Sequence, residues 1–247
     1  MTARALVVQH TATEGPGWLE EWLPSAGVEL AVVRPYAGER LPAELDAAAL
    51  VVLGGPMGAR DDGVAPWLPA TRELLRSAVR RGVPVLGLCL GGQLLASACG
   101  GRVQSGGSGP EIGVHELRLR PAARDDALLS GLPPVTRALQ WHYDEIAVLP
   151  PQAVWLAESA ACRHQAFRVG ERAWGLQFHV EAPVRMVAGW ASQDAEELAR
   201  RRMEPAVVVE ALRSAEPELT QTWRGVADRF AAVVLGHAPV IVEGART

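Results

Sequence analysis

Four short runs rich in valine and leucine lie in the first ninety residues, and their spacing constrains the fold of the chain. They cover residues 5–10, 27–34, 48–56 and 82–89. None shows a clean alternation of apolar and polar residues, which is typical of strands covered on both faces by helices. Residues 66–82, between the third and fourth runs, carry an apolar stripe at helical spacing and end at a glycine. This order predicts an α/β fold with a parallel, doubly wound sheet.

The middle of the chain has a different pattern. Five further runs predict short strands, at residues 113–120, 135–146, 153–159, 162–169 and 172–180. The first and fourth contain stretches in which apolar and polar residues alternate, as in half-exposed strands. We therefore expect antiparallel strands added at the edge of the central sheet.

The residues after Glu181 predict packing helices that continue to about Leu235. An apolar face at helical spacing is formed by Leu219, Trp223, Val226, Phe230 and Val233. No internal repeat or interdomain linker is evident in the sequence. We predict one domain over residues 1–247, with a core at about 4–190 and packing helices at about 191–236.

Composition and charge exclude several classes of function. The 247 residues carry a formal charge of −4, which argues against a nucleic-acid partner. The chain contains no lysine, which excludes a Schiff-base enzyme and a Walker-type phosphate loop. The three cysteines are too few for a disulfide framework, and the N-terminus does not resemble a signal peptide. Glycines and a proline interrupt the longest apolar stretch. We expect a cytoplasmic protein with no membrane partner.

The segment Gly87-Leu88-Cys89-Leu90-Gly91-Gly92-Gln93 carries the strongest chemical signal. It follows a predicted strand and precedes a predicted helix over residues 93–99. A Gly-x-nucleophile-x-Gly turn of this kind holds its central side chain in a strained conformation at the carboxyl end of a strand. The helix N-terminus favours a thiolate there. Cys89 is therefore a candidate nucleophile; the alternative is a buried, inert cysteine.

A second signal is Gly175-Leu176-Gln177-Phe178-His179-Val180-Glu181, which ends another apolar strand. A cysteine nucleophile needs an imidazole to accept and return a proton, and the imidazole needs a partner that fixes its tautomer. His179 and Glu181 are two residues apart, so on a regular strand they share one face. The alternative is a histidine satisfied within the core.

Backbone groups complete the candidate site. The segment Leu53-Gly54-Gly55-Pro56 follows the third strand, and its glycines allow a close approach to the nucleophile. Its N–H groups, together with that of Leu90, would form an oxyanion hole. A simple turn is the alternative, because Gly-Gly-Pro sequences are common in turns.

Three other sets of residues are weaker candidates. Cys162 and His164 have the spacing of a metal chelate, but no second pair completes a site of four ligands. Cys99 is expected to be inert core filler. His10 and Glu14 follow the first strand and are secondary candidates for the substrate entrance.

In this order, the segments 53–56, 87–93 and 175–181 resemble the class I glutamine amidotransferases, which use a Cys-His-Glu triad. The resemblance covers about residues 4–190. The stretches QHTATEGPG, WHYDE and HQAFRVG are similar to the stand-alone branch that resembles the amidotransferase domain of GMP synthase. The resemblance implies a flavodoxin-like three-layer sandwich, with a mostly parallel central sheet and an antiparallel extension.

The same resemblance implies roles for individual residues. Cys89 would be the nucleophile, His179 the base and Glu181 its orienting partner. The oxyanion donors would be the backbone N–H groups of Gly55 and Leu90. The substrate-binding positions would be Gly54, Gln93, His142, Tyr143 and Asp144. No metal or organic cofactor is implied.

The expected reaction is hydrolysis of a γ-glutamyl amide, such as glutamine, through a cysteine thioester. Because the sequence shows no nucleotide-binding segment, the ammonia would pass to a separate synthase subunit. Alternatively, the protein acts alone as a γ-glutamyl hydrolase or peptidase. The glycine-rich segments at 14–17 and 105–110 would then form an open entrance. A non-catalytic thiol sensor or binding protein is the alternative of another class.

Overall fold

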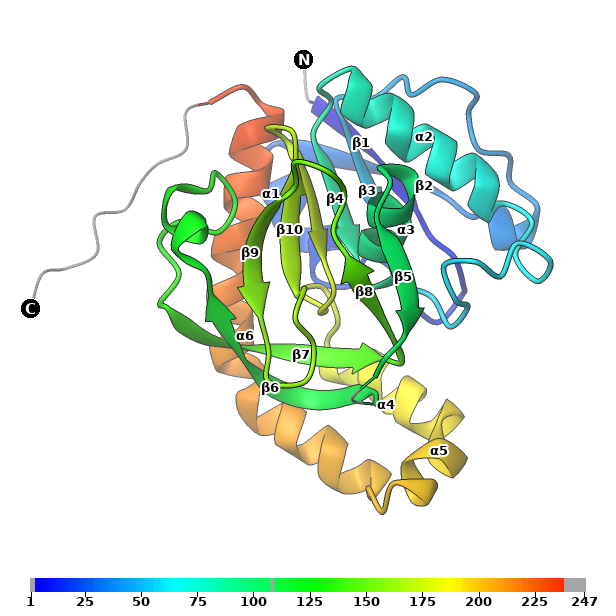
Figure 1. Cartoon of the computed structure of the whole chain (residues 1–247), viewed down its shortest axis with the longest axis vertical. Coiled ribbons are helices and arrows are strands. Elements are labelled where there is room, and N and C mark those ends of the chain that lie inside the picture. The colour runs from blue at the N-terminus through cyan, green and yellow to red at the C-terminus, as the bar shows by residue number, and fades with distance from the viewer. Residues whose placement is uncertain (1–2, 108, 238–247) are drawn as a thin grey trace, which may run out of the picture.

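A computed structural model describes residues 3–107 and 109–237. In these residues nine strands form one sheet in the order β2-β1-β3-β4-β11-β10-β9-β6-β7 (Figure 1). The parallel half contains β1 (Ala3–Val8), β2 (Val28–Val33), β3 (Ala49–Val52), β4 (Val85–Leu88) and β11 (Ala173–Leu176). The antiparallel half contains β6 (Glu111–Leu119), β7 (Val135–His142), β9 (Val154–Glu158) and β10 (Ala166–Val169).

Helices cover both faces of the parallel half and create two separate apolar cores. One core contains α2 (Leu68–Arg80) and α3 (Leu90–Ala98). The other contains α1 (Leu19–Ser25) and α6 (Pro205–Val234), together with α4 (Val184–Gln193) and α5 (Ala195–Arg200). Two short 3-10 helices, η1 (Pro35–Ala37) and η2 (Pro121–Asp125), lie in connections. This three-layer α/β arrangement confirms the predicted fold class.

The first four predicted strands and the helix that follows the third are all present. Residues 27–34, 48–56 and 82–89 contain β2 to β4, and residues 66–82 contain α2; β1 overlaps the predicted run at 5–10 but begins two residues earlier, at Ala3. The helix expected at 93–99 begins earlier, at Leu90, directly after Cys89. Two glycines follow Leu90, and their low helix propensity concealed this first turn from the sequence.

The middle of the chain differs from the prediction in three respects. The run at 135–146 is two strands, because the chain breaks at Tyr143 and β8 (Asp144–Val148) leaves the main sheet. β8 instead forms a separate two-stranded sheet with β5 (Arg102–Ser105), a strand that was not predicted. The run at 172–180 ends as a strand at Leu176, and this strand pairs in parallel with β4 inside the sheet rather than at its edge.

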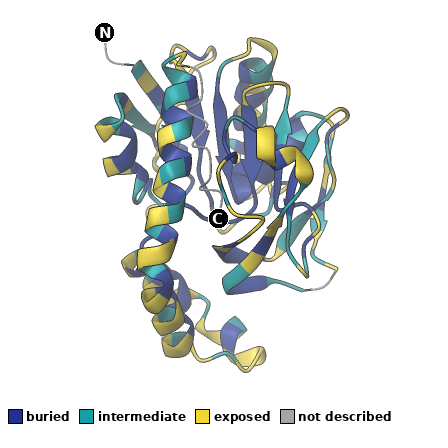
Figure 2. Cartoon of the chain, turned by 90° about the vertical axis from the view of Figure 1, so that its left-hand side faces the viewer, coloured by how far each residue is buried: buried dark blue, intermediate teal, exposed yellow. Residues whose placement is uncertain are grey.

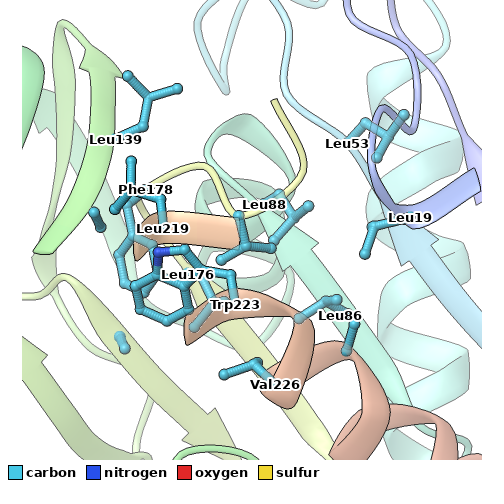
Figure 3. Close-up of a cluster of buried hydrophobic side chains, with 14 of the residues drawn as sticks. Leu19, Leu53, Leu86, Leu88, Leu139, Leu176, Phe178, Leu219, Trp223 and Val226 are labelled. Atoms are coloured by element: carbon cyan, nitrogen blue, oxygen red, sulfur yellow. The ribbon is translucent and has the colours of Figure 1, made fainter. Parts of the chain in front are cut away.

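The long helix α6 packs one apolar face against the sheet. Figure 2 shows buried residues along one side of this helix and exposed residues along the other. All five residues of the predicted face, from Leu219 to Val233, are buried. Trp223 contacts Phe178, with ring centroids 4.9 Å apart, and both lie in the cluster of Figure 3. Since Phe178 precedes His179, α6 supports the backbone that carries the histidine.

Some predictions extend beyond the residues described. The predicted domain includes residues 1–2 and 238–247, and the predicted loop at 105–110 includes residue 108; these residues lie outside the description. In residues 3–107 and 109–237, no helix is both long and apolar enough to cross a membrane.

Candidate active site

Cys89 occupies a sharp turn between β4 and α3. Its φ of 49° and ψ of −108° lie outside the regions that non-glycine residues ordinarily adopt. Such strain persists only where the surroundings enforce it, and it is concentrated at functional sites. Here the enforcing contacts are very close: a Cβ atom on Gly91 would lie 2.0 Å from the carbonyl oxygen of Val52. The predicted nucleophile turn is therefore present in the geometry of the backbone.

His179 lies beyond the end of β11, on a segment that the neighbouring sheet and helices hold in place. Its N–H donates to the carbonyl of Leu139 on β7, at 2.9 Å. The indole of Trp190, on α4, lies against its ring with a centroid distance of 4.7 Å. His179 and Glu181 were expected on a regular strand, but only an isolated bridge remains there. The two side chains nevertheless meet.

The imidazole and carboxylate form a buried pair. His179 Nδ1 lies 2.8 Å from Glu181 Oε1, and both side chains are about 2% exposed. Burial alone lowers the pKa of His179, but the negative charges of Glu181 and Cys89 outweigh it and raise the pKa well above its ordinary value. His179 Nε2 has no hydrogen-bond partner among the described residues. The pair therefore stabilises an imidazolium whose second nitrogen remains available.

Two groups border the sulfur of Cys89. The carbonyl oxygen of Trp141 and the side-chain nitrogen of Gln177 each lie 3.8 Å from Sγ. The amide of Gln177 can donate to a thiolate, whereas the carbonyl of Trp141 can accept from a thiol. Both protonation states of the sulfur therefore have a partner.

The residues that carry the proposed oxyanion donors line the same cavity as the thiol. A Cβ atom on Gly55 would be 3.0 Å from Leu90 Cδ2, and Gly55, Leu90 and Cys89 all line one cavity. Within the described residues, neither the Gly55 N–H nor the Leu90 N–H donates to another protein group. Both are therefore available to an acceptor that enters the cavity. Gly54, in the same loop, faces the histidine, since a Cβ atom there would be 3.0 Å from His179 Cε1.

Gln93 is already engaged by the protein. Its side-chain nitrogen donates to the carbonyl of Asp144 and to Gln177 Oε1, both at 3.2 Å. These two contacts use both of its N–H groups and leave Oε1 as the free polar atom. Contact of Gln93 with a substrate remains a prediction, but its link to Asp144 is present.

The segment His142 to Asp144 forms one wall of the cavity. The ring of His142 donates from Nδ1 to the carbonyl of Asp144, at 2.9 Å. The Tyr143 hydroxyl donates to Asp194 Oδ2 at 2.8 Å, and Trp141 Nε1 donates to the same oxygen at the same distance. Asp194 therefore joins this segment to the end of α4.

The cavity has a volume of about 460 Å³ and contains residues that the sequence did not single out. Asp194 and Trp190 line it, but nothing in their local sequence marks them, because they reach the site only through the packing of α4. Glu14 also lines it, as the sequence suggested.

His10 does not line this cavity, whereas Glu14, the other secondary candidate for the substrate entrance, does. It lies beneath the loop of Gly55, and its Nδ1 accepts a hydrogen bond from Trp67 Nε1 at 3.0 Å. Burial lowers the pKa of His10 to about 4, so the ring is neutral at physiological pH. These contacts indicate that His10 supports the loop that carries Gly55.

One group of side chains has the composition of a metal site. The ligand atoms of Glu111, His142 and Cys162 lie within 4.8 Å of one another. The sequence paired Cys162 with His164 instead, but His164 is hydrogen-bonded through Nδ1 to the carbonyl of Ile146. Burial raises the pKa of Cys162 to about 12, which favours the neutral thiol. Both Glu111 oxygens also accept hydrogen bonds, from Ser159 and Gln165. The group is a hydrogen-bonded cluster as it stands.

One cavity, at the carboxyl end of the parallel strands, is thus lined by a cysteine at a strained turn, by the residues with free N–H groups and by a histidine that is paired with a buried glutamate. This combination is suited to acyl transfer through a thioester.

Comparison with known proteins identifies relatives among the glutamine amidotransferases. Residues 18–186 match the family model described as "Glutamine amidotransferase class-I". A glutamine amidotransferase-like protein of Salmonella typhimurium, YfeJ, is 33% identical over 79% of this chain and 83% of its own length. A subunit of the glutamine-hydrolysing GMP synthase of Halobacterium salinarum is 36% identical over 57% of this chain and 69% of its own. A glutamine amidotransferase structure from Methylobacillus flagellatus covers both chains completely, with 33% identity and a TM-score of 0.82.

The chain belongs to the class I glutamine amidotransferase family. The family and the class of enzyme predicted from the sequence are thereby confirmed. The family-level activity is hydrolysis of the glutamine amide.

Proposed function

We propose that Cys89 attacks the γ-carbonyl carbon of a γ-glutamyl amide and forms a thioester. The observation that carries this proposal is the buried His179–Glu181 pair, whose histidine lines the same cavity as the strained Cys89 turn. The thiolate forms the C–S bond, and the carbonyl electrons move onto oxygen. The free N–H groups of Gly55 and Leu90 then stabilise the oxyanion.

His179 carries the proton in both halves of the reaction. As the tetrahedral intermediate collapses, its Nε2 donates a proton to the departing amine and the C–N bond breaks. The neutral imidazole then removes a proton from water, which attacks the thioester and releases glutamate and the thiol. Glu181 does not transfer protons; it holds Nδ1 and stabilises the imidazolium.

The substrate main chain is proposed to lie along the wall formed by residues 142–144. Gln93 supports this wall through its bond to the carbonyl of Asp144, and Gly54 leaves room beside the triad. Tyr143 is held by Asp194, so its side chain closes the wall rather than entering the protein core.

We further propose that the ammonia is passed to a separate synthase subunit. Relatives that are themselves named as one subunit of a glutamine-hydrolysing GMP synthase support this partner. All three cysteines are free, which supports the expected reducing, cytoplasmic location.

The volume of the cavity favours a second candidate, a γ-glutamyl hydrolase that acts alone. About 460 Å³ lies within the range of roughly 300–1,000 Å³ found for sites that take drug-sized ligands. Such a site accommodates a leaving amine larger than ammonia.

Steady-state release of glutamate from L-glutamine and from γ-glutamyl dipeptides distinguishes the two candidates. The Cys89→Ala variant is the control for contaminating activity. Glutamine turnover that rises on addition of a co-purifying synthase supports the ammonia donor. Rapid cleavage of dipeptides, with little cleavage of glutamine, supports the hydrolase. Cleavage of neither substrate, with or without the synthase, contradicts both.

A further inference from the structure

Glu14 is an acidic side chain in the cavity that the proposed mechanism does not use. It belongs to the loop between β1 and α1, which is fixed to the triad segment. The N–H of Trp18 donates to the carbonyl of Glu181 at 2.8 Å. Gly17 packs so closely that a Cβ atom on it would lie 2.0 Å from that same oxygen. The position of Glu14 is therefore tied to the position of the triad.

The carboxylate of Glu14 lies beside the reacting groups. The point that a Cβ atom would occupy on Gly54 is 2.7 Å from Glu14 Oε2, 3.0 Å from His179 Cε1 and 3.7 Å from Cys89 Cβ. Only the missing side chain at Gly54 separates these three residues. A small group that enters next to the thiol therefore meets the Glu14 carboxylate.

This carboxylate lacks a partner in the protein. No hydrogen bond from the described residues reaches it, and burial raises its pKa to about 7 despite the opposing influence of His179. Glu14 is partly buried, and a carboxylate removed from water without a donor is unfavourable, so an entering cation relieves this cost. A second carboxylate, that of Asp194, also lines the cavity and contributes to the raised pKa of Glu14. Among the described lining residues, Arg60 is the one arginine, and it is exposed.

We propose that Glu14 binds the α-ammonium group of the substrate and so restricts this site to γ-glutamyl compounds with a free α-amino group. The inference rests on the proposed function of Cys89. In a γ-glutamyl amide the α-nitrogen is four bonds from the carbon under attack, which is about 5 Å in an extended chain. The position that a Cβ atom would occupy on Gly54 is 3.7 Å from Cys89 Cβ and 2.7 Å from Glu14 Oε2, so a chain of that length that enters here can reach the carboxylate. A charge-assisted hydrogen bond then fixes the substrate's orientation.

The test is the rate at which Cys89 is alkylated by two diazoketones, followed by mass spectrometry of the intact chain. One reagent is 6-diazo-5-oxo-L-norleucine, which carries the α-amino group; the other is 6-diazo-5-oxohexanoic acid, which lacks it. Labelling requires no turnover and no synthase partner. We expect the wild type to prefer the amino reagent, and Glu14→Gln to reduce that preference by ~10- to 100-fold, as for the loss of a hydrogen bond between charged groups.

Two controls separate recognition from other roles. Iodoacetamide reports the intrinsic reactivity of the thiol, and the diazoketone rates are divided by its rate. Asp61→Asn removes another carboxylate that lines the cavity, where Asp61 accepts a hydrogen bond from the Gly58 N–H. This variant is expected to keep the preference for the amino reagent.

Three results would overturn the inference. An equal loss with both reagents in Glu14→Gln would assign the residue to proton transfer or to folding. An equal loss of preference in Asp61→Asn would reduce the effect to the general charge of the cavity. An unchanged preference in Glu14→Gln would remove Glu14 from substrate recognition. If neither diazoketone labels Cys89 in the wild type while iodoacetamide does, the proposed function fails as well.

Discussion

At the residue scale, the titratable side chains of the site differ in the groups that surround them. His179 is surrounded by negative charge and has its pKa raised, whereas Glu14 is partly buried without a donor and also has its pKa raised. The first shift favours a charged imidazolium, and the second favours a neutral carboxyl group. Mutation of the triad should therefore affect catalysis, whereas mutation of Glu14 should also affect the pH dependence of stability.

The three triad residues should differ in the severity of their loss. Cys89→Ala should abolish glutamate release, because no thioester forms. His179→Ala should lose at least ~10²–10⁴-fold in kcat, since proton transfer fails in both half-reactions. Glu181→Gln keeps an oxygen that can accept from Nδ1 and removes only the charge, so its loss should be smaller. The measurement is kcat for glutamine, with circular dichroism to confirm folding. A folded Glu181→Gln as inactive as Cys89→Ala would contradict the orienting role.

Glu14→Gln should stabilise the fold at high pH. The carboxyl group has an ordinary pKa of 4.5 and about 7 in the folded chain, so the folded state binds its proton more tightly. Stability therefore falls as pH rises from 4.5 to 7, by up to about 3 kcal/mol. Thermal unfolding of wild type and variant should show a higher Tm for the variant at pH 8 and no gain at pH 4. A difference that is independent of pH would show that the carboxylate is well solvated.

At the scale of elements, the turn at Cys89 requires α3 to lie almost in contact with β3. Gly91→Ala would place a methyl group 2.0 Å from the carbonyl oxygen of Val52, which belongs to the backbone and cannot rotate away. We expect a loss of roughly 2 kcal/mol or more in the free energy of unfolding, as for other overpacked sites. Urea denaturation measures this.

Gly189→Ala is the matched control for that substitution. Gly189 is also a helical glycine, on α4, but a Cβ atom there meets nothing within 4 Å. The higher helix propensity of alanine should stabilise this variant by ~0.5–1 kcal/mol. Similar losses in both variants would mean that the cost at Gly91 does not come from the close approach of α3 to β3.

Elements with a clear local pattern in the sequence could be predicted, and those that depend on distant partners could not. The strands β1 to β4 lie in runs rich in valine, leucine and alanine, and glycine or proline lies close to the ends of β2 to β4; such runs identify buried strands. By contrast, β5 has the sequence Arg-Val-Gln-Ser and exists because β8 pairs with it. The sequence also placed β11 in the antiparallel edge, since its position beside β4 is a property of the tertiary fold.

At the scale of the whole molecule, the sequence revealed the residues that lie on short motifs and missed those brought in by packing. Cys89, His179 and Glu181 each follow a buried strand, so their meeting point could be expected at the sheet's carboxyl edge. Trp190 and Asp194 come from a helix after the sheet, and only the packing of α4 places them in the cavity. No spacing rule connects such positions to the motifs.

A γ-glutamyl thioester at Cys89 is the central intermediate of the proposed reaction. Wild-type protein is mixed with L-glutamine, quenched in acid within the turnover time, digested and analysed by peptide mass mapping; Cys89→Ala is treated in parallel. We expect a γ-glutamyl mass on the peptide containing Cys89, none on the peptides containing Cys99 or Cys162, and no glutamate release by the variant. Glutamate release that persists in Cys89→Ala would contradict the proposed reaction.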